Sequence, residues 1–344
     1  MRKQSAVIIF LLIVVCVILV TYSATIKFSS AKVNNECDVV DNSYTSDFDS
    51  LNYMNSFDVS DFSGKELNTI DIASKQYAPN NISIADSDFK ISDSLLTEIY
   101  DSINGYGASS SFYIVSLNDG MSIAYNVDKA YETASSIKAP YALFISEQID
   151  AGNIDPNQEI IYEEHHYNKG TGIIKKSDFG TPFTVKELIY YSLNDSDNIA
   201  HAMLHKTFGV NGYNDMLRNL GTKQLYLTVS NPWGYMSPRS SALIWQEVYN
   251  YSIRSEEGIN FLNILSNGKY NYFKEVMPTI PSASKTGFAN KDVVETGIVF
   301  GNQPYIAIAV ANKGGNIGAY TQVLKLVNYM NDIMNEYDGY LKSR

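Results

Sequence analysis

Arginine is scarce in this chain of 344 residues, and acidic residues outnumber basic ones. Arginine occurs only at Arg2, Arg218, Arg239, Arg254 and Arg344. The 37 Asp and Glu residues against 26 Lys and Arg residues give a formal net charge of −11. Domains that bind nucleic acid present a basic face, so no nucleic-acid partner is expected. Bidentate anion binding by arginine clusters is not expected either, which leaves lysine or backbone amides for any anion.

Cysteine is almost absent. The two cysteines, Cys16 and Cys37, exclude an internal disulfide framework and a cysteine metal site. Cys16 lies in an apolar run, where it is interpreted as a small apolar residue. The residues before it, IVV, lack the small side chains that usually precede a lipid-modified cysteine. Cys37 is interpreted as a free thiol, with pairing between chains as the alternative.

Charge is also missing from Gln4 to Ile26, where AVIIFLLIVVCVILV is almost wholly aliphatic. This run is long enough to span a bilayer. Arg2 and Lys3 precede it, so the positive-inside rule predicts a cytoplasmic tail at 1–4, a signal anchor at 5–26 and the rest of the chain outside the cell. A cleaved signal peptide is the alternative, but poor small-residue spacing near TYSATIK favours the uncleaved anchor. The predicted location is the cell membrane, single-pass, with the folded domain extracellular.

Residues 27–91 keep no sustained hydrophobic period. Much of this region, NNECDVVDNSYTSDFDSLNYMNSFDVSDFSGKELN, is dense in Asn, Asp and Ser with scattered aromatics. The composition predicts an acidic, mostly disordered stalk that joins the anchor to a folded domain at 92–344.

From Ser92 onward the apolar residues follow regular periods. SLLTEIYDSI predicts a helix, and SSFYIVSL and MSIAYNV flank NDG, a hairpin signal. Helices are expected over ETASSIKAPYALFISEQIDAG, on both sides of NDSDN, and from Pro238. VVETGIVFG and PYIAIAVANKGG predict strands, and AYTQVLKLVNYMNDIMNEY predicts a closing amphipathic helix. The fold class is therefore α+β: an antiparallel sheet from both ends of the domain, flanked by N- and C-terminal helices, with an all-helical subdomain between.

The segment ETASSIKAPYALF places one lysine at the start of an apolar helix. Ser135 and Lys138 are three residues apart and share a helix face, whereas Ser136 is two residues from the lysine and points elsewhere. A lysine can take the proton of a serine hydroxyl where desolvation and nearby cations lower its pKa. The apolar residues after Lys138 would supply that desolvation. An ordinary capped helix with a surface lysine is the alternative.

Two further triplets complete a known set. SDN stands at Ser196, Asp197 and Asn198 in a predicted turn, and KTG stands at residues 285–287, just before a predicted strand. S-x-x-K, SDN and KTG in this order are the motifs of class A β-lactamases and penicillin-binding proteins. The domain from about Ser92 to the C-terminus therefore resembles the class A β-lactamase-like serine hydrolases, the superfamily shared with penicillin-binding D,D-peptidases.

The resemblance implies a role for each motif residue. Ser135 would be the acylated nucleophile and Lys138 its proton acceptor. Ser196 would relay a proton toward the leaving group, and Asn198 would bind the substrate amide and contact Lys138. Asp197 is expected to be a structural hydrogen-bonding residue of the turn.

The third motif is implied to bind the rest of the substrate. Lys285, the remaining catalytic residue, and Thr286 would supply positive potential and a hydroxyl for a substrate carboxylate. Gly287 would allow the edge strand to approach closely. The backbone N–H groups of Ser135 and Phe288 would form the oxyanion hole.

Acidic residues are absent from Met216 to Gln246. Class A β-lactamases hold a deacylating water with a glutamate on a loop after the second motif, and the corresponding region here is LGTKQLYLTVSNPWGYMSPRSSAL. Glu163 or Glu164 reaching in from elsewhere is not favoured. We therefore expect an acyl-enzyme that persists, with peptidase, esterase or slow-acylation behaviour rather than efficient β-lactam hydrolysis.

Two functional hypotheses follow. The first is an exported, membrane-anchored serine hydrolase that acts on cell-wall peptide, ester or β-lactam carbonyls. The second is a slow or inactive protein of the same fold that binds or senses such molecules; the intact motifs favour the first. No cofactor or metal is expected, because the pairs His165–His166 and His201–His205 lack a complete ligand set. GTG at 170–172 is interpreted as a turn.

Overall fold

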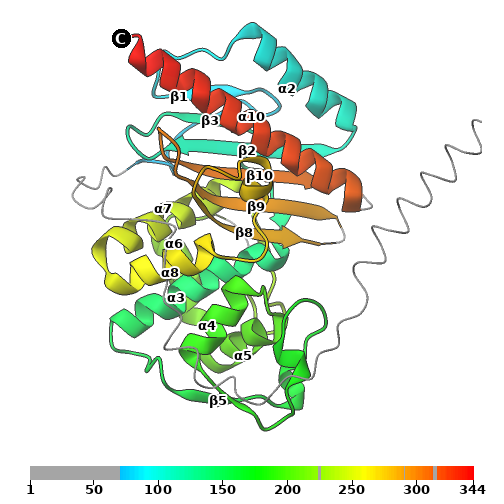
Figure 1. The fold of residues 1–344 in the computed structure, drawn as a ribbon, viewed down its shortest axis with the longest axis vertical. Helices are drawn as coiled ribbons and strands as arrows, with labels where there is room; N and C mark the ends of the chain where they lie inside the picture. The colour runs from blue at the N-terminus through cyan, green and yellow to red at the C-terminus, as the bar shows by residue number, and fades with distance from the viewer. Residues whose placement is uncertain (1–69, 224–225, 290, 313–315) are drawn as a thin grey trace, which may run out of the picture. The chain divides into compact units, whose positions relative to one another are not determined.

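The computed structural model describes residues 70–223, 226–289, 291–312 and 316–344 (Figure 1). The predicted tail, the signal anchor at 5–26 and the stalk up to residue 69 lie outside these residues. Within the described part of the chain, no helix combines the length and apolar character needed to cross a membrane.

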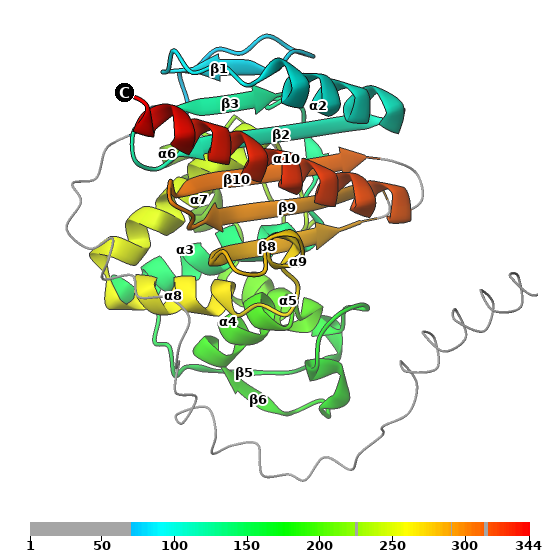
Figure 2. The same ribbon diagram turned by 45° about the horizontal axis from the view of Figure 1, so that its top comes forward.

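A six-stranded antiparallel sheet forms the centre of the folded unit (Figure 2). Its strands, in spatial order, are β1 (Ser83–Ala85), β3 (Ser122–Tyr125), β2 (Ser109–Ser116), β10 (Tyr305–Asn312), β9 (Asp292–Val299) and β8 (Ser282–Phe288). Every pairing is antiparallel, and strands from both ends of the domain meet where β2 pairs with β10. The predicted sheet is confirmed, and β8 forms one of its edges.

Helices α2 (Asp93–Tyr106) and α10 (Asn316–Lys342) cover one face of this sheet (Figure 1). The predicted apolar stripe of α10, which includes Val323, Leu326 and Ile333, is buried there. Ser92 caps α2 by accepting the N–H of Leu95. The expected flanking by N- and C-terminal helices is therefore confirmed.

The opposite face carries the helical part of the domain. Its helices are α3 (Lys138–Asp150), α4 (Val185–Asn194), α5 (Asn198–Phe208), α6 (Asn211–Asn219), α7 (Pro238–Arg254) and α8 (Glu256–Ser266). A short helix, α9 (Tyr272–Val276), precedes β8. Two small ribbons pair β4 (Tyr131–Glu132) with β7 (Tyr235–Met236), and β5 (Glu159–Ile161) with β6 (Pro182–Thr184). Local signals set the helix starts: Pro238 stands in the first turn of α7, and a capping box between Thr184 and Glu187 opens α4.

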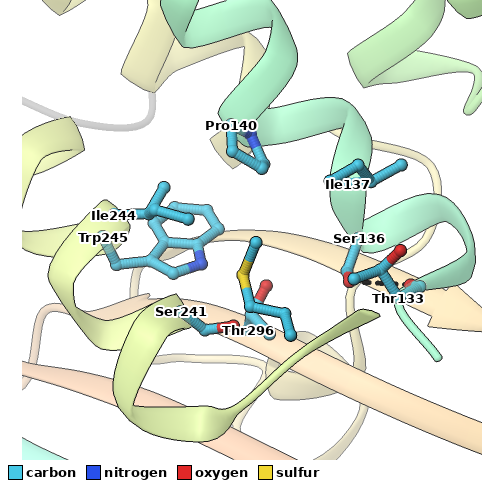
Figure 3. A pocket seen from close by; sticks show the side chains of 9 residues that line it. Thr133, Ser136, Ile137, Pro140, Ser241, Ile244, Trp245 and Thr296 are labelled. Carbon is cyan, nitrogen blue, oxygen red and sulfur yellow. Dashed lines mark hydrogen bonds between the residues drawn. The ribbon is translucent and has the colours of Figure 1, made fainter. Parts of the chain in front are cut away.

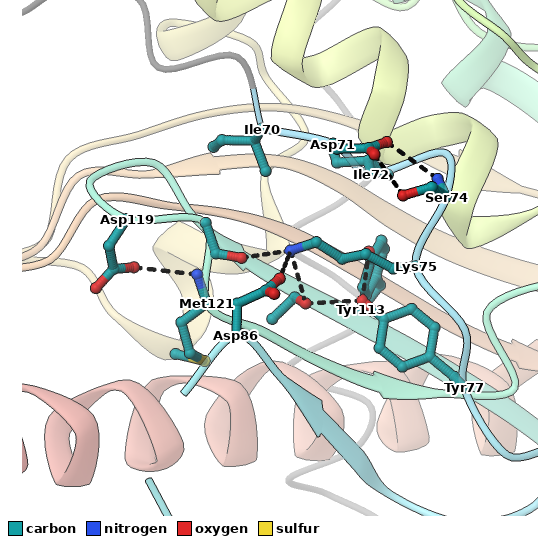
Figure 4. A network of polar contacts seen from close by, with 12 residues as sticks. Ile70, Asp71, Ile72, Ser74, Lys75, Tyr77, Asp86, Tyr113, Asp119 and Met121 are labelled. Carbon is teal, nitrogen blue, oxygen red and sulfur yellow. Dashed lines mark hydrogen bonds and ion pairs between the residues drawn. The ribbon is translucent and has the colours of Figure 1, made fainter. Parts of the chain in front are cut away.

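Residues 70–91 are an ordered part of the domain, so the predicted stalk boundary is wrong at this end. Ile70 and Ile72 are buried in the core, and β1 pairs with β3. The amine of Lys75 bonds the carbonyl of Gly120 at 2.5 Å and the carboxylate of Asp86 at 2.6 Å (Figure 4). The segment shows no hydrophobic period because it inserts side chains singly and its only strand has three residues.

Arg239 fixes the same segment to the start of α7. Its guanidinium pairs with both oxygens of Asp128, at 2.6 and 2.9 Å, and donates to the carbonyls of Ile72 and Lys75. The guanidinium also lies 5.2 Å from the ring centroid of Tyr77. Residues 70–86, which we call the N-terminal strap, are therefore held by both the sheet and the helical part of the domain.

Candidate active site

The nucleophile segment begins with a short 3-10 helix, Ala134–Ile137, and α3 starts at Lys138. The single helix expected across this segment is thus divided, with Ser135 on the tighter turn. Ala134 has φ 46°, a left-handed backbone that residues other than glycine rarely adopt. Such conformations cluster at functional sites because the surrounding structure must hold them in place.

Ser135 and its neighbour Ser136 point in different directions. The hydroxyl of Ser136 is buried and donates to the carbonyl of Thr133 at 2.7 Å, within a small hollow between α3 and α7 (Figure 3). Ser135 is partly exposed, and its Oγ lies 3.0 Å from the Nζ of Lys138. The structure therefore brings together the predicted pair and excludes Ser136.

Lys138 is completely buried. Burial lowers the pKa of its amine well below the usual value, the nearby charge of Lys285 lowers it further, and Asp197 opposes both effects. A lowered pKa increases the fraction of the amine that is neutral and carries a free lone pair. Lys138 can therefore accept the proton of Ser135, as a general base must.

The SDN turn supplies the other partners of Lys138. The amine donates to the carbonyl of Ser196 at 2.5 Å and to Oδ1 of Asn198 at 2.7 Å, and it lies 3.2 Å from Oγ of Ser196. Ser196 has φ 52°, a second left-handed residue at the site. The side chain of Asn198 also donates to the carbonyl of Lys169 at 2.6 Å. The first and second motifs thus meet at one amine.

Asp197 holds the turn itself. One carboxylate oxygen accepts the N–H groups of Ile199 and Ala200 and so caps α5. The other oxygen accepts those of Ile173 and Ile174, at 2.6 and 2.9 Å. This is the structural role expected for Asp197.

The third motif lies within β8 rather than before a strand, because the edge strand begins at Ser282. The Nζ of Lys285 is 3.0 Å from Oγ of Ser196. Burial lowers the pKa of Lys285 to about 8, although the nearby carboxyl of Glu295 acts in the opposite direction. Thr286 follows on the same strand and is also buried. Lys285 and Lys138 therefore contact the same hydroxyl group.

Gly287 lies against the nucleophile segment. A Cβ atom at this position would stand 2.3 Å from the carbonyl oxygen of Thr133 and 3.1 Å from the nitrogen of Ser136. Only glycine fits this approach of edge strand to 3-10 helix. The next residue, Phe288, is the last of β8 and is 49% exposed.

The GTG segment, expected to be a simple turn, forms a cradle for the second motif. The hydroxyl of Thr171 donates to the carbonyl of Ser196 at 2.6 Å. The backbone carbonyl of Thr171 accepts the N–H of Asn198 at 3.1 Å. A Cβ on Gly170 would meet Asn198 at 2.4 Å. The one signal in the sequence was a pair of glycines two residues apart, which does not reveal what they pack against.

The loop that follows the second motif has no acidic residue between Met216 and Gln246, and it brings Trp233 beside Lys138. The ring centroid of Trp233 is 5.5 Å from the Nζ of Lys138. Glu163, the alternative source of a carboxylate, is exposed and pairs with His165 within its own loop. Among the described residues, no group of three or more His, Cys, Asp or Glu side chains could hold a metal ion.

Comparison with known sequences identifies relatives of this chain. The family model of the Beta-lactamase enzyme family, Beta-lactamase2, matches residues 94–333. The chain is 28% identical to beta-lactamase regulatory protein BlaB of Streptomyces cacaoi over 135 residues, 39% of this chain and 43% of BlaB. It is also 28% identical to beta-lactamase VEB-1 of Pseudomonas aeruginosa over 119 residues, 34% of this chain and 40% of VEB-1. The chain thus spans less than half the length of these curated relatives.

Solved structures share the fold. A β-lactamase from Sphaerobacter thermophilus DSM 20745 has a TM-score of 0.63 at 19% identity, over 70% of this chain and 97% of that one. A variant of PBP-A, solved as an acyl-enzyme complex with penicillin G, has a TM-score of 0.65 at 18% identity, over 71% of this chain and 97% of that one. The family model matches most of the described residues, and both this match and the shared fold agree with the three motifs. The chain belongs to the β-lactamase enzyme family.

Proposed function

We propose that this protein is a serine acyl-transfer enzyme that is acylated at Ser135 and deacylates slowly. The observation that carries the proposal is the buried amine of Lys138, 3.0 Å from the hydroxyl of Ser135. A neutral lysine at this distance is a competent base, whereas a surface lysine would be protonated at neutral pH.

The chemistry uses the residues of all three motifs. Lys138 takes the proton as Oγ of Ser135 forms a bond to the carbonyl carbon of the acyl donor. As the bond to the leaving group breaks, the leaving atom takes a proton through the hydroxyl of Ser196, which contacts both lysines. The backbone N–H groups of Ser135 and Phe288 stabilise the negative carbonyl oxygen.

Substrate binding falls to Asn198, Lys285 and Thr286. Asn198 binds the donor amide, and the Lys285 ammonium with the Thr286 hydroxyl binds a substrate carboxylate. The glycine at 287 lets this strand lie beside the nucleophile. The acyl donor is a cell-wall peptide, an ester or a β-lactam.

Slow deacylation follows from the chemistry of the loop after the second motif. Water attacks an ester efficiently only when a base removes its proton. The described part of the segment from Met216 to Gln246 offers no carboxylate, and the contacts of Glu163 lie within its own loop. The acyl-enzyme is therefore the form that accumulates.

The proposed location is the cell membrane. The uncharged run at 5–26 would be a single-pass signal anchor and residues 1–4 its cytoplasmic tail, with the catalytic domain outside the cell. Extracellular placement gives the enzyme access to cell-wall peptides and β-lactams. Immunodetection of the C-terminus on intact cells, before and after external protease, tests this topology.

Intact-protein mass spectrometry of the full chain with a penicillin, beside Ser135→Ala, tests the acylation. A long-lived adduct on the wild-type chain alone is the expected result. Rapid consumption of the penicillin without adduct would contradict slow deacylation. If neither adduct nor consumption occurs, ester and D-Ala-D-Ala donors are tested in the same way, and their failure would refute the enzyme proposal.

A second candidate is a protein of this fold that binds or senses β-lactams or cell-wall peptides without turnover. The similarity to a protein named as a β-lactamase regulator supports it. Its signature is saturable binding of a donor that persists in Ser135→Ala, since sensing without chemistry does not need the nucleophile.

A further inference from the structure

Trp233 is a neighbour of Lys138 that none of the three motifs supplies. The ring centroid lies 5.5 Å from the lysine nitrogen, inside the distance of about 6 Å at which a cation is attracted to an aromatic face. The hydrogen-bond partners of Lys138 described above lie on the nucleophile turn and the SDN turn. Trp233 therefore contacts the amine from a different element, the loop after the second motif.

Several contacts fix this tryptophan. The hydroxyl of Thr133 donates to the carbonyl of Trp233, which ties the loop to the residue before the nucleophile turn. The ring of His201 lies 5.3 Å from the tryptophan ring, and its Nε2 is 3.1 Å from the carbonyl of Pro232. Burial lowers the pKa of His201 to about 3, so this imidazole is neutral and Nε2–H donates to the carbonyl. These contacts hold the indole in place beside Lys138.

Few charged groups face Lys138. Lys285 approaches from β8 and disfavours a second positive charge, whereas Asp197 from the SDN turn favours it. His201, from α5, is neutral at physiological pH. When Lys138 takes a proton, the new ammonium therefore lies in a buried site where Lys285 repels it and Asp197 attracts it. The electron-rich face of an indole offsets part of that cost without adding a charge.

We propose that Trp233 is a positioning residue for acyl transfer, whose ring face stabilises the Lys138 ammonium formed during acylation. This inference rests on the proposed function. In the step concerned, the O–H bond of Ser135 breaks and the lone pair of the Lys138 nitrogen takes the proton. The serine oxygen forms a bond to the acyl carbon as the π pair of the C=O bond moves to the carbonyl oxygen. Trp233 acts on the product of the proton transfer, takes no proton itself and forms no bond to the substrate.

The direct test is the titration of Lys138 in the full chain, followed by NMR of ¹³Cε-labelled lysine and assigned with Lys138→Ala. Trp233→Leu keeps an apolar side chain but removes the π face, and Trp233→Phe keeps a weaker one. Tyr235→Leu is the matched control, since Tyr235 is an exposed aromatic residue two positions further on, in β7. We expect the Lys138 midpoint to fall by about 0.5–1 pH unit in Trp233→Leu, less in Trp233→Phe, and not in the control.

The rate of acylation by penicillin should follow the titration. In Trp233→Leu the rise of the rate with pH moves to lower pH by the same amount, and the plateau falls several-fold because the lysine is a weaker base. A cooperative thermal unfolding transition first shows that each variant is folded. If Trp233→Leu does not fold, the comparison is made with Trp233→Phe.

The possible failures can be told apart. A wild-type midpoint in a folded Trp233 variant, or an equal shift in Tyr235→Leu, would overturn the inference and leave the proposed function intact. A shifted titration in a protein that no donor acylates would overturn the role in acyl transfer and the proposed function together.

Discussion

The Nζ of Lys285 lies 3.0 Å from the hydroxyl oxygen of Ser196, the same hydroxyl that Lys138 approaches to 3.2 Å. Burial lowers the pKa of Lys285 to about 8. The ammonium is therefore present below about pH 8 and is lost as the pH rises above this value. Its positive charge is available for a substrate carboxylate only on the acid side.

This relationship predicts the pH dependence of substrate affinity. We expect the affinity for a penicillin to fall above about pH 8, and the methyl ester of the same penicillin to show no such fall. Kinetics of acylation at a series of donor concentrations, from pH 6 to pH 10, measure both. Lys285→Gln should bind the two donors alike at every pH. An equal pH dependence for acid and ester would assign carboxylate binding to another group.

Loss of the base should stop acylation without unfolding the domain. Lys138→Ala removes the amine beside Ser135, and general-base catalysis contributes about 10²–10⁴-fold to such steps. The acylation rate is expected to fall by at least the lower figure, while the far-UV circular dichroism spectrum stays unchanged. The adduct yield by mass spectrometry gives the rate. Acylation at the wild-type rate would remove Lys138 as the base.

Gly287→Ala should damage both fold and site. The added Cβ would lie 2.3 Å from the carbonyl of Thr133, so β8 must move away from the nucleophile turn. Overpacking of this kind costs about 1–3 kcal/mol of unfolding free energy. We expect a lower melting temperature and slower acylation. Gly301→Ala is the control, because its nearest neighbour would be a side-chain atom of Ile280 at 3.9 Å.

Asp197→Asn should loosen the GTG cradle more than the helix cap. One amide oxygen can still cap α5, but the amide nitrogen would face the N–H groups of Ile173 and Ile174, which need an acceptor. The loss of hydrogen bonds to a buried carboxylate costs about 1.5–3 kcal/mol. Denaturant unfolding measures this cost. Hydrogen exchange should rise at residues 173–174 more than at Ile199, and a uniform rise would contradict the argument.

The true domain boundary can be tested by truncation. A chain that starts at Ser92 lacks the N-terminal strap and the burial of Ile70 and Ile72, which contribute about 1.5–3 kcal/mol each. We expect it to be about 3–6 kcal/mol less stable than a chain that starts at Ile70. Equal urea midpoints for the two chains would show that the strap adds no stability.

The motif residues were predictable because their chemistry is tied to short local patterns. Ser135 with Lys138 and the SDN turn lie at element boundaries that hydrophobic periodicity reveals. The third motif was recognised from its triplet alone, and β8, the strand on which it lies, was not predicted. The sheet and the α10 stripe follow from the same periods. These features are local in the sequence, so the structure confirms the elements and brings the residues together.

The missed features depend on contacts between distant segments. The N-terminal strap is held by Lys75 and by Arg239, and neither contact leaves a period in the sequence. The cradle at Gly170 and the tryptophan beside Lys138 likewise arise from the tertiary fold. The 3-10 helix that precedes α3 has only four residues, too few for the spacing of apolar side chains to distinguish it from a turn of α-helix.

The absence of a carboxylate in the loop after the second motif limits how many acyl-donor molecules each copy of the protein can process. Under the proposed function, a site that acylates and then retains its acyl group is consumed one molecule at a time. Its capacity is then set by the number of copies in the membrane, and by how fast new copies are made, rather than by a turnover number. A loop without a carboxylate would thus make the protein a stoichiometric acceptor, one acyl group per copy, of the acyl donors that reach the cell.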